Sequence, residues 1–166
     1  QDALQCVQEH IGAGTPMVDA TLAQACKGIA PSRLPKHPLV DTKRETRLRH
    51  SLGQSLPDWL KLRSGKVGTV TDGVAFPESS EQVQELLAYA KNCGASVIPM
   101  GGGTSVVGHL TVPQNDTPVL TINLSRLSRL FNLDPESQLA TFGAGVLGPD
   151  LEAQLRAQGY TLGHFP

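Results

Sequence analysis

Residues 97–108 read Val-Ile-Pro-Met-Gly-Gly-Gly-Thr-Ser-Val-Val-Gly, a short apolar run that leads directly into three consecutive glycines. The apolar run predicts a short buried strand that ends at Met100. Three glycines after a strand allow the backbone to take positive φ and to present several N–H groups on one side. Because no side chains stand in the way, a diphosphate can approach this backbone closely. The hydroxyls of Thr104 and Ser105 add donors at the rim.

The two common nucleotide-binding loops do not match this stretch. A Walker loop needs GxxxxGK[ST], and the sequence contains no lysine after Lys91. The GxGxxG fingerprint needs a helix directly after the loop, which Val106-Val107 and Pro113 disfavour. An alternative without any ligand is a tight glycine turn between two strands. The elements around the glycines help to decide between a phosphate-binding loop and a simple turn.

A strand–helix–strand pattern leads into the glycines. Val74-Ala75-Phe76 predicts a strand ended by Pro77, and Ser79 with Gln82 forms a capping box that opens a helix. The helix stops near Gly94 and carries one apolar face, formed by Val83, Leu86, Leu87 and Ala90. Such a βαβ unit normally gives a parallel pair of strands.

Further strands and a helix follow the glycines. Residues 119–124 predict a strand, and residues 130–133 and 139–142 predict a hairpin around the turn at 134–137. Gly148-Pro149-Asp150 opens a last helix, with Leu147, Leu151 and Leu155 on one face and Gly159 as its stop. The order of elements indicates an α+β fold.

The N-terminal part is of a different kind. Residues 1–30 predict helix, with Thr15 as a cap before Pro16 and with apolar residues at helical spacing from Val18 to Ile29. Residues 31–56 predict irregular structure, and a short helix is expected from Ser55 to Arg63. We therefore divide the chain into an N-terminal helical and irregular extension, residues 1–70, and a second domain, residues 71–166.

Composition excludes several classes of protein. The chain has 166 residues and a net charge of −1, so no overall field attracts nucleic acid. Its apolar runs are far shorter than the roughly 20 residues of a membrane span. Three widely spaced cysteines, Cys6, Cys26 and Cys93, argue against a disulfide scaffold and a structural zinc site. We expect no metal, no membrane span and a reducing, cytoplasmic setting.

Four segments together carry a resemblance to a known family: residues 74–83, 97–105, 120–124 and 143–146. In their order and content, from about Asp72 to Pro166, they resemble the first half of the vanillyl-alcohol-oxidase-type (PCMH-type) FAD-binding domain. The Gly-Gly-Gly-Thr-Ser form, with Gly159-Tyr160 and the final Gly163-His164-Phe165-Pro166, looks most like the alkyldihydroxyacetonephosphate-synthase branch and its bacterial FAD-linked oxidase relatives.

The resemblance implies that the glycine loop carries the FAD pyrophosphate. Covalent members attach flavin through a His beside the glycines; Thr104 stands at that position here, which implies non-covalent FAD. The second flavin segment of the family begins about where this chain ends, so the domain is truncated at its C-terminus and no catalytic residue can be assigned. The implied cofactor-binding residues are Pro99, Met100, Gly101, Gly102, Gly103, Thr104, Ser105, Val106, Gly108 and Pro166.

The implied function is that of an FAD-dependent oxidoreductase acting on a small organic substrate such as a hydroxy acid. In such enzymes the protein positions the flavin, and the flavin takes a hydride equivalent. Two alternatives remain: an alkyldihydroxyacetonephosphate-synthase-like exchange with no net redox change, and a non-catalytic fragment that does not retain flavin alone. The expected partners are FAD and a small-molecule substrate, with self-association through the truncated apolar face.

Three other residues attract attention. His109 follows the glycine loop, where a solvent-facing turn position is favoured over a place against the flavin. His164 lies where the second flavin segment should start, and a surface position is favoured over contact with the cofactor. Trp59 lies in a leader, residues 51–68, that resembles one packed near the flavin domain of bacterial FAD-linked oxidases. A core anchor for the N-terminal arm is the favoured role of this indole.

Overall fold

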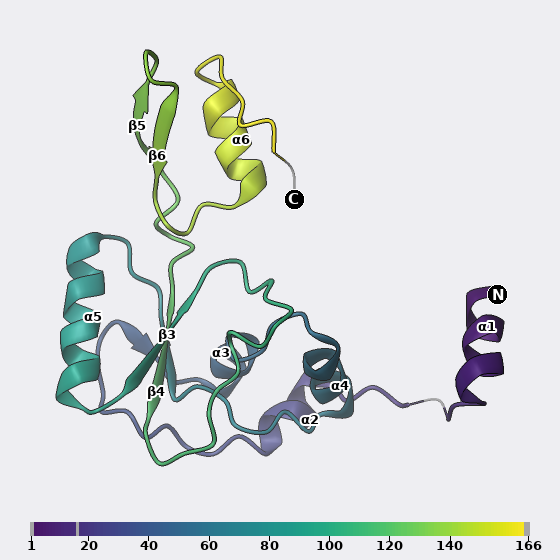
Figure 1. Ribbon diagram of the computed structural model, residues 1–166. Coiled ribbons are helices and arrows are strands. Elements are labelled where there is room, and N and C mark those ends of the chain that lie inside the picture. Colours follow the sequence, from purple (N-terminus) through teal and green to yellow (C-terminus); the bar gives the residue numbers. More distant parts are fainter. Residues whose placement is uncertain (1, 16, 165–166) are drawn as a thin grey trace.

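The computed structural model describes residues 2–15 and 17–164. A four-stranded sheet lies between helix α5 on one side and helices α2, α3 and α4 on the other, and a small lobe stands above this body (Figure 1). The elements in chain order are α1 (Asp2–Ile11), α2 (Leu22–Lys27), β1 (Val40–Asp41), α3 (Arg44–Arg49), α4 (Leu56–Ser64), β2 (Gly73–Ala75), α5 (Ser80–Asn92), β3 (Ser96–Met100), β4 (Val119–Asn123), β5 (Leu130–Asp134), β6 (Leu139–Phe142) and α6 (Gly148–Arg156).

The sheet has the strand order β1-β2-β4-β3. Strands β2 and β3 both run parallel to β4, with Ala75 opposite Ile122 and Ile98 opposite Thr121, and β1 is antiparallel to β2. The βαβ strands are thus parallel, but the expected direct pairing of β2 with β3 is wrong. Every residue of β4 is buried, which suits the position between them, whereas Pro99 has no N–H and suits the edge strand β3.

Two apolar cores flank the sheet. Leu86 and Ala90 of α5 pack on one face against Leu120 and Ile122 of β4. On the other side the core consists of Ala25, Ile29, Leu48, Leu52, Val67 and Val70. The expected face of α5 is therefore confirmed at Leu86 and Ala90, whereas Leu87 is about half exposed.

The capping of α5 is only half a capping box. The hydroxyl of Ser79 accepts the amide of Gln82, as expected, but the side chain of Gln82 accepts the amide of Glu78 instead of the Ser79 amide. The helix still begins and ends where its sequence indicates, since Gly94 follows the last turn with φ 68°.

The N-terminal expectations need two corrections. Thr15 caps no helix and Pro16 lies outside the described residues; α2 begins instead after Thr21, which forms a complete capping box with Gln24. Val18, taken as part of an apolar helical face, is 90% exposed in the loop before α2. The segment expected to be irregular contains β1 and α3. By contrast, α4 is confirmed, with Ser55 and Asp58 as its capping box and Gly65 in the left-handed region at its end.

The lobe consists of the predicted hairpin and the last helix. The carboxylate of Asp134 accepts the amides of Glu136 and Ser137 and so closes the turn between β5 and β6. The side chain of Gln154 joins α6 to the hairpin, because it donates to the Ser128 carbonyl and accepts the Leu130 amide.

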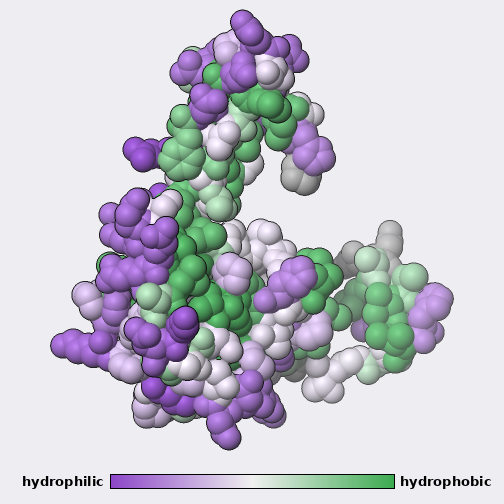
Figure 2. Space-filling view, turned by 60° about the vertical axis from the view of Figure 1, so that its left-hand side comes forward, coloured by the Kyte–Doolittle hydropathy of each residue, from purple (hydrophilic) through white to green (hydrophobic). Residues whose placement is uncertain are grey.

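A narrow neck joins the lobe to the body (Figures 1 and 2). Two chain segments, residues 124–129 and 143–146, cross here, and the amides of Gly143 and Gly145 donate to the carbonyls of Arg129 and Leu127. A Cβ atom at Gly143 would overlap the Leu127 carbonyl, and one at Gly145 would overlap that of Leu124. The Gly-Ala-Gly sequence is therefore a requirement of this backbone crossing.

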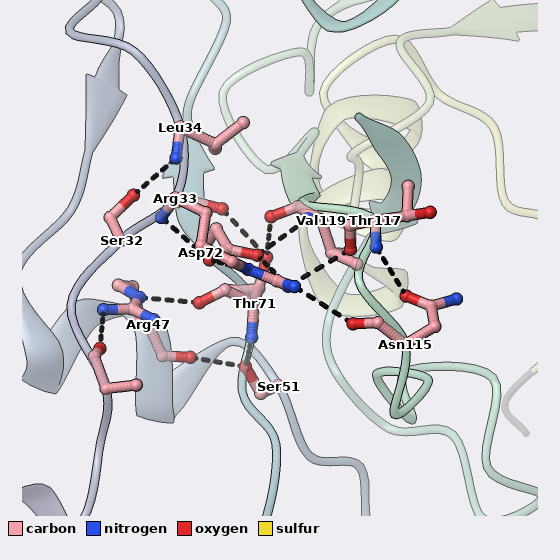
Figure 3. Close-up of polar contacts among 12 residues, drawn as sticks. Ser32, Arg33, Leu34, Arg47, Ser51, Thr71, Asp72, Asn115, Thr117 and Val119 are labelled. Carbon is pink, nitrogen blue, oxygen red and sulfur yellow. Dashed lines mark hydrogen bonds and ion pairs between the residues drawn. The ribbon is translucent and has the colours of Figure 1, made fainter. Parts of the chain in front are cut away.

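An ion pair between the exposed Arg33 and the buried Asp72 ties the N-terminal extension to the sheet (Figure 3). Asp72, 2% exposed, accepts hydrogen bonds from the Nη2, Nε and backbone N of Arg33 and from the amide of Val119. Burial alone would raise the pKa of this carboxyl, but these hydrogen bonds and the charge of Arg33 lower the pKa below its ordinary value. The two parts of the chain therefore share one polar network, with a buried carboxylate at its centre.

Two kinds of feature are absent from residues 2–15 and 17–164. None of their helices is long and apolar enough to cross a membrane. No group of three or more His, Cys, Asp or Glu side chains among them is placed to hold a metal ion.

Candidate functional site

The glycine loop begins at the carboxyl end of β3, where ligands commonly bind in open parallel sheets. The β3–β4 ladder ends with the hydrogen bond from the Leu124 amide to the Met100 carbonyl. Of the three glycines only Gly103 has positive φ, at 70°. The positive φ that a glycine run allows is therefore used at Gly103 and not at Gly101 or Gly102. A Cβ atom at Gly102 would lie 3.2 Å from the Leu147 side chain, whereas one at Gly101 would meet nothing within 4 Å.

The loop offers unpaired backbone donors. In the structure of residues 2–15 and 17–164, the amides of residues 102–107 donate to no other backbone or side-chain group. Most of these residues are exposed, including Val106 and Val107. Successive backbone amides without a partner in the protein are the donors that phosphate-binding loops use. The loop therefore has the donors that a diphosphate site needs.

Ser105 holds the C-terminal end of the glycine loop in place. Its carbonyl accepts the amide of Gln54 at 2.7 Å, and its hydroxyl accepts the amide of His109. Gly53 lies so close that a Cβ atom there would overlap the Ser105 carbonyl. Ser105 therefore fastens the loop, whereas Thr104 lines the cavity described next.

The contact with Ser105 changes the interpretation of the leader. Trp59 is 48% exposed, so it is not the core anchor that we expected. Instead the leader contacts the glycine loop through its backbone at Gly53 and Gln54. Sequence reasoning missed Gly53. The only signal available was a glycine between the apolar Leu52 and the helix cap Ser55, which does not reveal a partner so distant in the chain.

A cavity of about 990 Å³ lies between the glycine loop and the beginning of α6. Figure 2 shows the hollow between lobe and body, with hydrophobic residues on the body below the lobe. The volume lies at the upper end of the range for small-molecule sites, about 300–1,000 Å³. The lining residues are Gly102, Thr104, Leu147, Gly148, Pro149, Glu152, Ala153, Arg156 and His164.

The electrostatics of the cavity favour an anion. The first turn of α6 borders it, and Leu147 at the N-cap position makes no capping hydrogen bond with its side chain. The amides at the start of a helix carry a partial positive charge, which attracts phosphate groups. Arg156 and His164 lie on the same wall. Free loop amides on one side and a helix N-terminus on the other fit a diphosphate between them.

One acidic side chain lies in this wall. The Glu152 carboxylate accepts hydrogen bonds from Thr161 Oγ1 and from the amides of Leu162 and Gly163, and lies 3.5 Å from Arg156. The hydrogen bond from the Thr161 hydroxyl lowers the pKa of Glu152, whereas partial desolvation acts in the opposite direction. The hydrogen bonds from the two amides and the charge of Arg156 add to the lowering, so the pKa lies below its ordinary value. Its charge is thus held by donors of the protein itself.

The ten residues expected to bind the cofactor fall into several groups. Gly102 and Thr104 line the cavity. Met100 is buried beneath the loop, where its Cε lies 2.7 Å from the position of a Cβ on Gly103, and Pro99 is exposed on β3. Pro166 lies outside the described residues. The others, in the loop but not in the cavity wall, are Gly101, Gly103, Ser105, Val106 and Gly108, the last at a turn with φ 80°.

The two histidines considered in the sequence analysis differ in their position relative to the cavity. His109 is exposed and is held at a turn, away from the cavity wall. His164 is also exposed, but it lines the cavity. The wall formed by α6 was not expected from sequence at all, because helical periodicity identifies the buried face of α6 but not its distance from the loop.

A second cavity, of about 760 Å³, lies beside Arg33, Arg47 and Asp72. Its charges are already used within the protein: Arg33 pairs with Asp72, and Arg47 donates to the carbonyls of Ala30 and Thr71. The cavity beside the glycine loop combines larger volume with unpaired donors, and is the better candidate for the cofactor.

Comparisons with known proteins agree with this geometry. Residues 71–166 match the family described as FAD binding domain. Alkyldihydroxyacetonephosphate synthase of Dictyostelium discoideum is 35% identical over 72% of this chain, and D-2-hydroxyglutarate dehydrogenase of Danio rerio is 30% identical over 67% of it. The chain spans only 20% of the length of each.

A solved structure of alkyldihydroxyacetonephosphate synthase superimposes on 99% of this chain and 34% of its own, with a TM-score of 0.79 and 25% sequence identity. The likeness therefore includes the N-terminal extension as well as the glycine loop and the lobe. FAD is the cofactor of the matched domain, and the free amides, the helix N-terminus and the volume between them fit its diphosphate. The chain belongs to the family of PCMH-type FAD-binding domains.

Proposed function

We propose that this chain is the diphosphate-binding part of an FAD-dependent oxidoreductase that acts on a small 2-hydroxy acid. The single observation that carries the proposal is the run of free amides at residues 102–107, in a loop whose Gly102 and Thr104 line a cavity bordered by the first turn of α6. Similarity to D-2-hydroxyglutarate dehydrogenase supports the substrate class.

Each part of the site has a separate task. The amides after Gly101 and the first turn of α6 hold the diphosphate, and the hydroxyl of Thr104 adds a donor. Gly53 and Gln54 keep the loop in place through Ser105. When bound, FAD supplies the capacity to accept a hydride equivalent, and the protein supplies binding and orientation. We propose non-covalent attachment, because Thr104 is not a nucleophile of the kind that histidine provides.

A second function is favoured by a different observation. The similarity to alkyldihydroxyacetonephosphate synthase covers 72% of this chain in sequence and 99% in structure. We therefore keep as second candidate an ether-forming exchange at the same flavin site, with no net redox change. The two candidates share the cofactor and differ in whether electrons leave the enzyme.

One experiment separates the candidates. The full-length polypeptide is purified and its visible flavin spectrum recorded, first alone and then anaerobically with D-2-hydroxyglutarate and other short 2-hydroxy acids. Lasting loss of the oxidised flavin bands, with reduction of an added dye, supports the dehydrogenase. In a parallel incubation with an acyl ester of dihydroxyacetone phosphate and a long-chain alcohol, formation of an ether-linked product with release of the fatty acid, and without dye reduction, supports the exchange. A protein purified without flavin that also fails to bind added FAD contradicts both.

We also propose a reducing compartment such as the cytoplasm. The supporting observation is that Cys6, Cys26 and Cys93 are all free, with Cys6 exposed. Fractionation of cells that express the full-length protein tests this, and recovery from an oxidising compartment contradicts it.

A further inference from the structure

Glu152 is a buried carboxylate for which the sequence suggested no role. It lies in the middle of α6, and its side chain is 7% exposed. Three hydrogen bonds reach it from the segment after the helix: 2.8 Å from the Thr161 hydroxyl, 3.0 Å from the Leu162 amide and 3.1 Å from the Gly163 amide. The carboxylate of Glu152 thus accepts one hydrogen bond from each residue of the turn at residues 161–163.

That turn has little else to hold it. Residues 161–164 are exposed and belong to no helix or strand. Apart from Glu152, the described residues give the turn one hydrogen bond, from the Gly163 amide to Thr161 Oγ1, which lies within the turn itself. Without the carboxylate, few contacts would offset the conformational entropy that is lost when this segment is ordered.

The turn leads directly to the cofactor cavity. His164 follows Gly163 and lines the cavity together with Gly102 and Thr104 of the glycine loop. The glycine loop is fixed independently, through Ser105. The position of His164 against the loop therefore depends on what holds residues 161–163.

We propose that Glu152 is a positioning residue for the cofactor: its carboxylate holds the turn at residues 161–163, so that His164 closes the cavity opposite the glycine loop. The proposal rests on the function proposed above, in which FAD occupies this cavity. Cofactor binding and the hydrogen bonds to Glu152 are then linked, and each strengthens the other by the same factor.

The negative charge of Glu152 does not conflict with a diphosphate nearby. Three donors of the turn and the guanidinium of Arg156, 3.5 Å away, surround it. Glutamine at this position keeps the size of the side chain but removes its charge and one of its two acceptor oxygens; the remaining oxygen can still accept the Leu162 and Gly163 amides, and the NH₂ group replaces the oxygen that accepts from Thr161. Because hydrogen bonds to a charged acceptor are the stronger ones, the variant Glu152→Gln weakens the hold on the turn with little change in shape.

The test uses the full-length protein and two measurements. The first is the dissociation constant for FAD, with the visible circular dichroism of the bound flavin. The second is hydrogen exchange of the Leu162 and Gly163 amides, with and without FAD. Glu152→Gln should raise the dissociation constant about tenfold or more, alter the flavin signal and speed exchange. Glu136→Gln, an exposed carboxylate in the β5–β6 turn, is the matched control and should change none of these.

The outcomes separate the two claims. If Glu152→Gln speeds exchange but leaves FAD affinity and the flavin signal unchanged, Glu152 holds the turn for structural reasons only and the proposal fails. Unchanged exchange also overturns it. Should Glu152→Gln fail to fold, Thr161→Val removes one of the three hydrogen bonds and decides by the same measurements. Wild-type protein that binds no FAD overturns the proposed function, while exchange still reports whether Glu152 holds the turn.

Discussion

The amide of Gln54 donates a hydrogen bond of 2.7 Å to the carbonyl of Ser105, and this contact joins the N-terminal extension to the glycine loop. Free amides bind a phosphate well only when the loop that carries them is already in the right shape, because ordering it at the moment of binding costs free energy. The extension therefore supports the loop of the candidate cofactor site, although it lies before the residues that match the family.

Gly53 permits this contact and gives the first prediction. In Gly53→Ala the new methyl group would overlap the Ser105 carbonyl, so the loop must move. We expect the FAD dissociation constant of the full-length protein to rise about tenfold, or about 1.4 kcal/mol. Gly28→Ala is the control, since a Cβ atom there meets nothing within 4 Å. Equal affinity of both variants would show that the contact does not shape the loop.

The glycines of the loop give the second prediction. Valine at Gly103 is strained because φ is 70°, and its Cβ meets Met100. Valine at Gly102 puts methyl groups between Leu147 and Thr104, in the cavity wall. We expect either variant to lose FAD and to retain the far-UV circular dichroism of the wild type. Gly101→Ala, with open space around its Cβ, should keep more flavin. Stoichiometric flavin in either valine variant contradicts the prediction.

The third prediction concerns attachment of the cofactor. Thr104 has no nucleophile for the flavin methyl carbon comparable to the histidine of covalent relatives. We expect trichloroacetic acid to release all flavin from the holoenzyme into the supernatant. A yellow precipitate after washing would mean that another residue is bonded to the flavin.

The fourth prediction concerns Arg33 and Asp72 and depends on pH. The pKa of Asp72 is lowered in the folded protein, so its stabilising effect is complete above the ordinary value of about 3.9 and is lost as pH falls through the lower, folded value. Arg33→Met should cost about 2–3 kcal/mol at neutral pH, because a buried carboxylate loses its charged partner.

Denaturant titrations of the full-length protein at several pH values measure the effect of Arg33→Met. The difference from wild type should shrink in acid, once Asp72 is protonated in both. Arg49→Met, whose partner Glu45 is exposed, is the control and should cost less than about 1 kcal/mol. A difference for Arg33→Met that stays constant down to acid pH would mean that packing, and not the ion pair, is responsible.

The fifth prediction concerns residues 1–166 as a separate polypeptide. Each free amide contributes only about 1 kcal/mol net in an open, wet site, which barely offsets association costs of about 4–15 kcal/mol. We expect a dissociation constant for FAD in the high micromolar range or weaker. Isothermal titration measures it, and a value at or below about 1 μM would show that this part alone is a sufficient site.

The strongest local signals in the sequence predicted most of the fold. Short apolar runs marked β2, β3 and β4, turn chemistry marked the hairpin, and caps placed α4 and α5 correctly. The order of the strands could not be obtained in this way, because local patterns do not state that β4 enters between β2 and β3. Thr15, followed by Pro16, carries the sequence signal of a helix cap, but no helix begins there. The helix begins after Thr21, which offers the same signal six residues later and completes the capping box with Gln24.

Only one side of the candidate site could be predicted from the sequence. The glycine run gave the loop, because backbone freedom is visible in the sequence as missing side chains. The opposite wall depends on how the lobe is oriented, which no local pattern contains. For the same reason Gly53 and Glu152 escaped notice: each acts through a partner brought near by tertiary structure. The N-terminal boundary of the family match, residue 71, likewise separates Asp72 from its partner Arg33.

The crossing at Gly143 and Gly145 sets the orientation of the lobe by contact of backbone with backbone, and it lies below the whole lobe in Figure 1. Because both segments that enter the lobe pass through this crossing, a substitution that displaced it would displace the whole lobe. The distance between α6 and the glycine loop therefore depends on residues that do not line the cavity between them. Evolution could therefore refit this domain to a different ligand by changes around the neck, while the glycine loop stays the same.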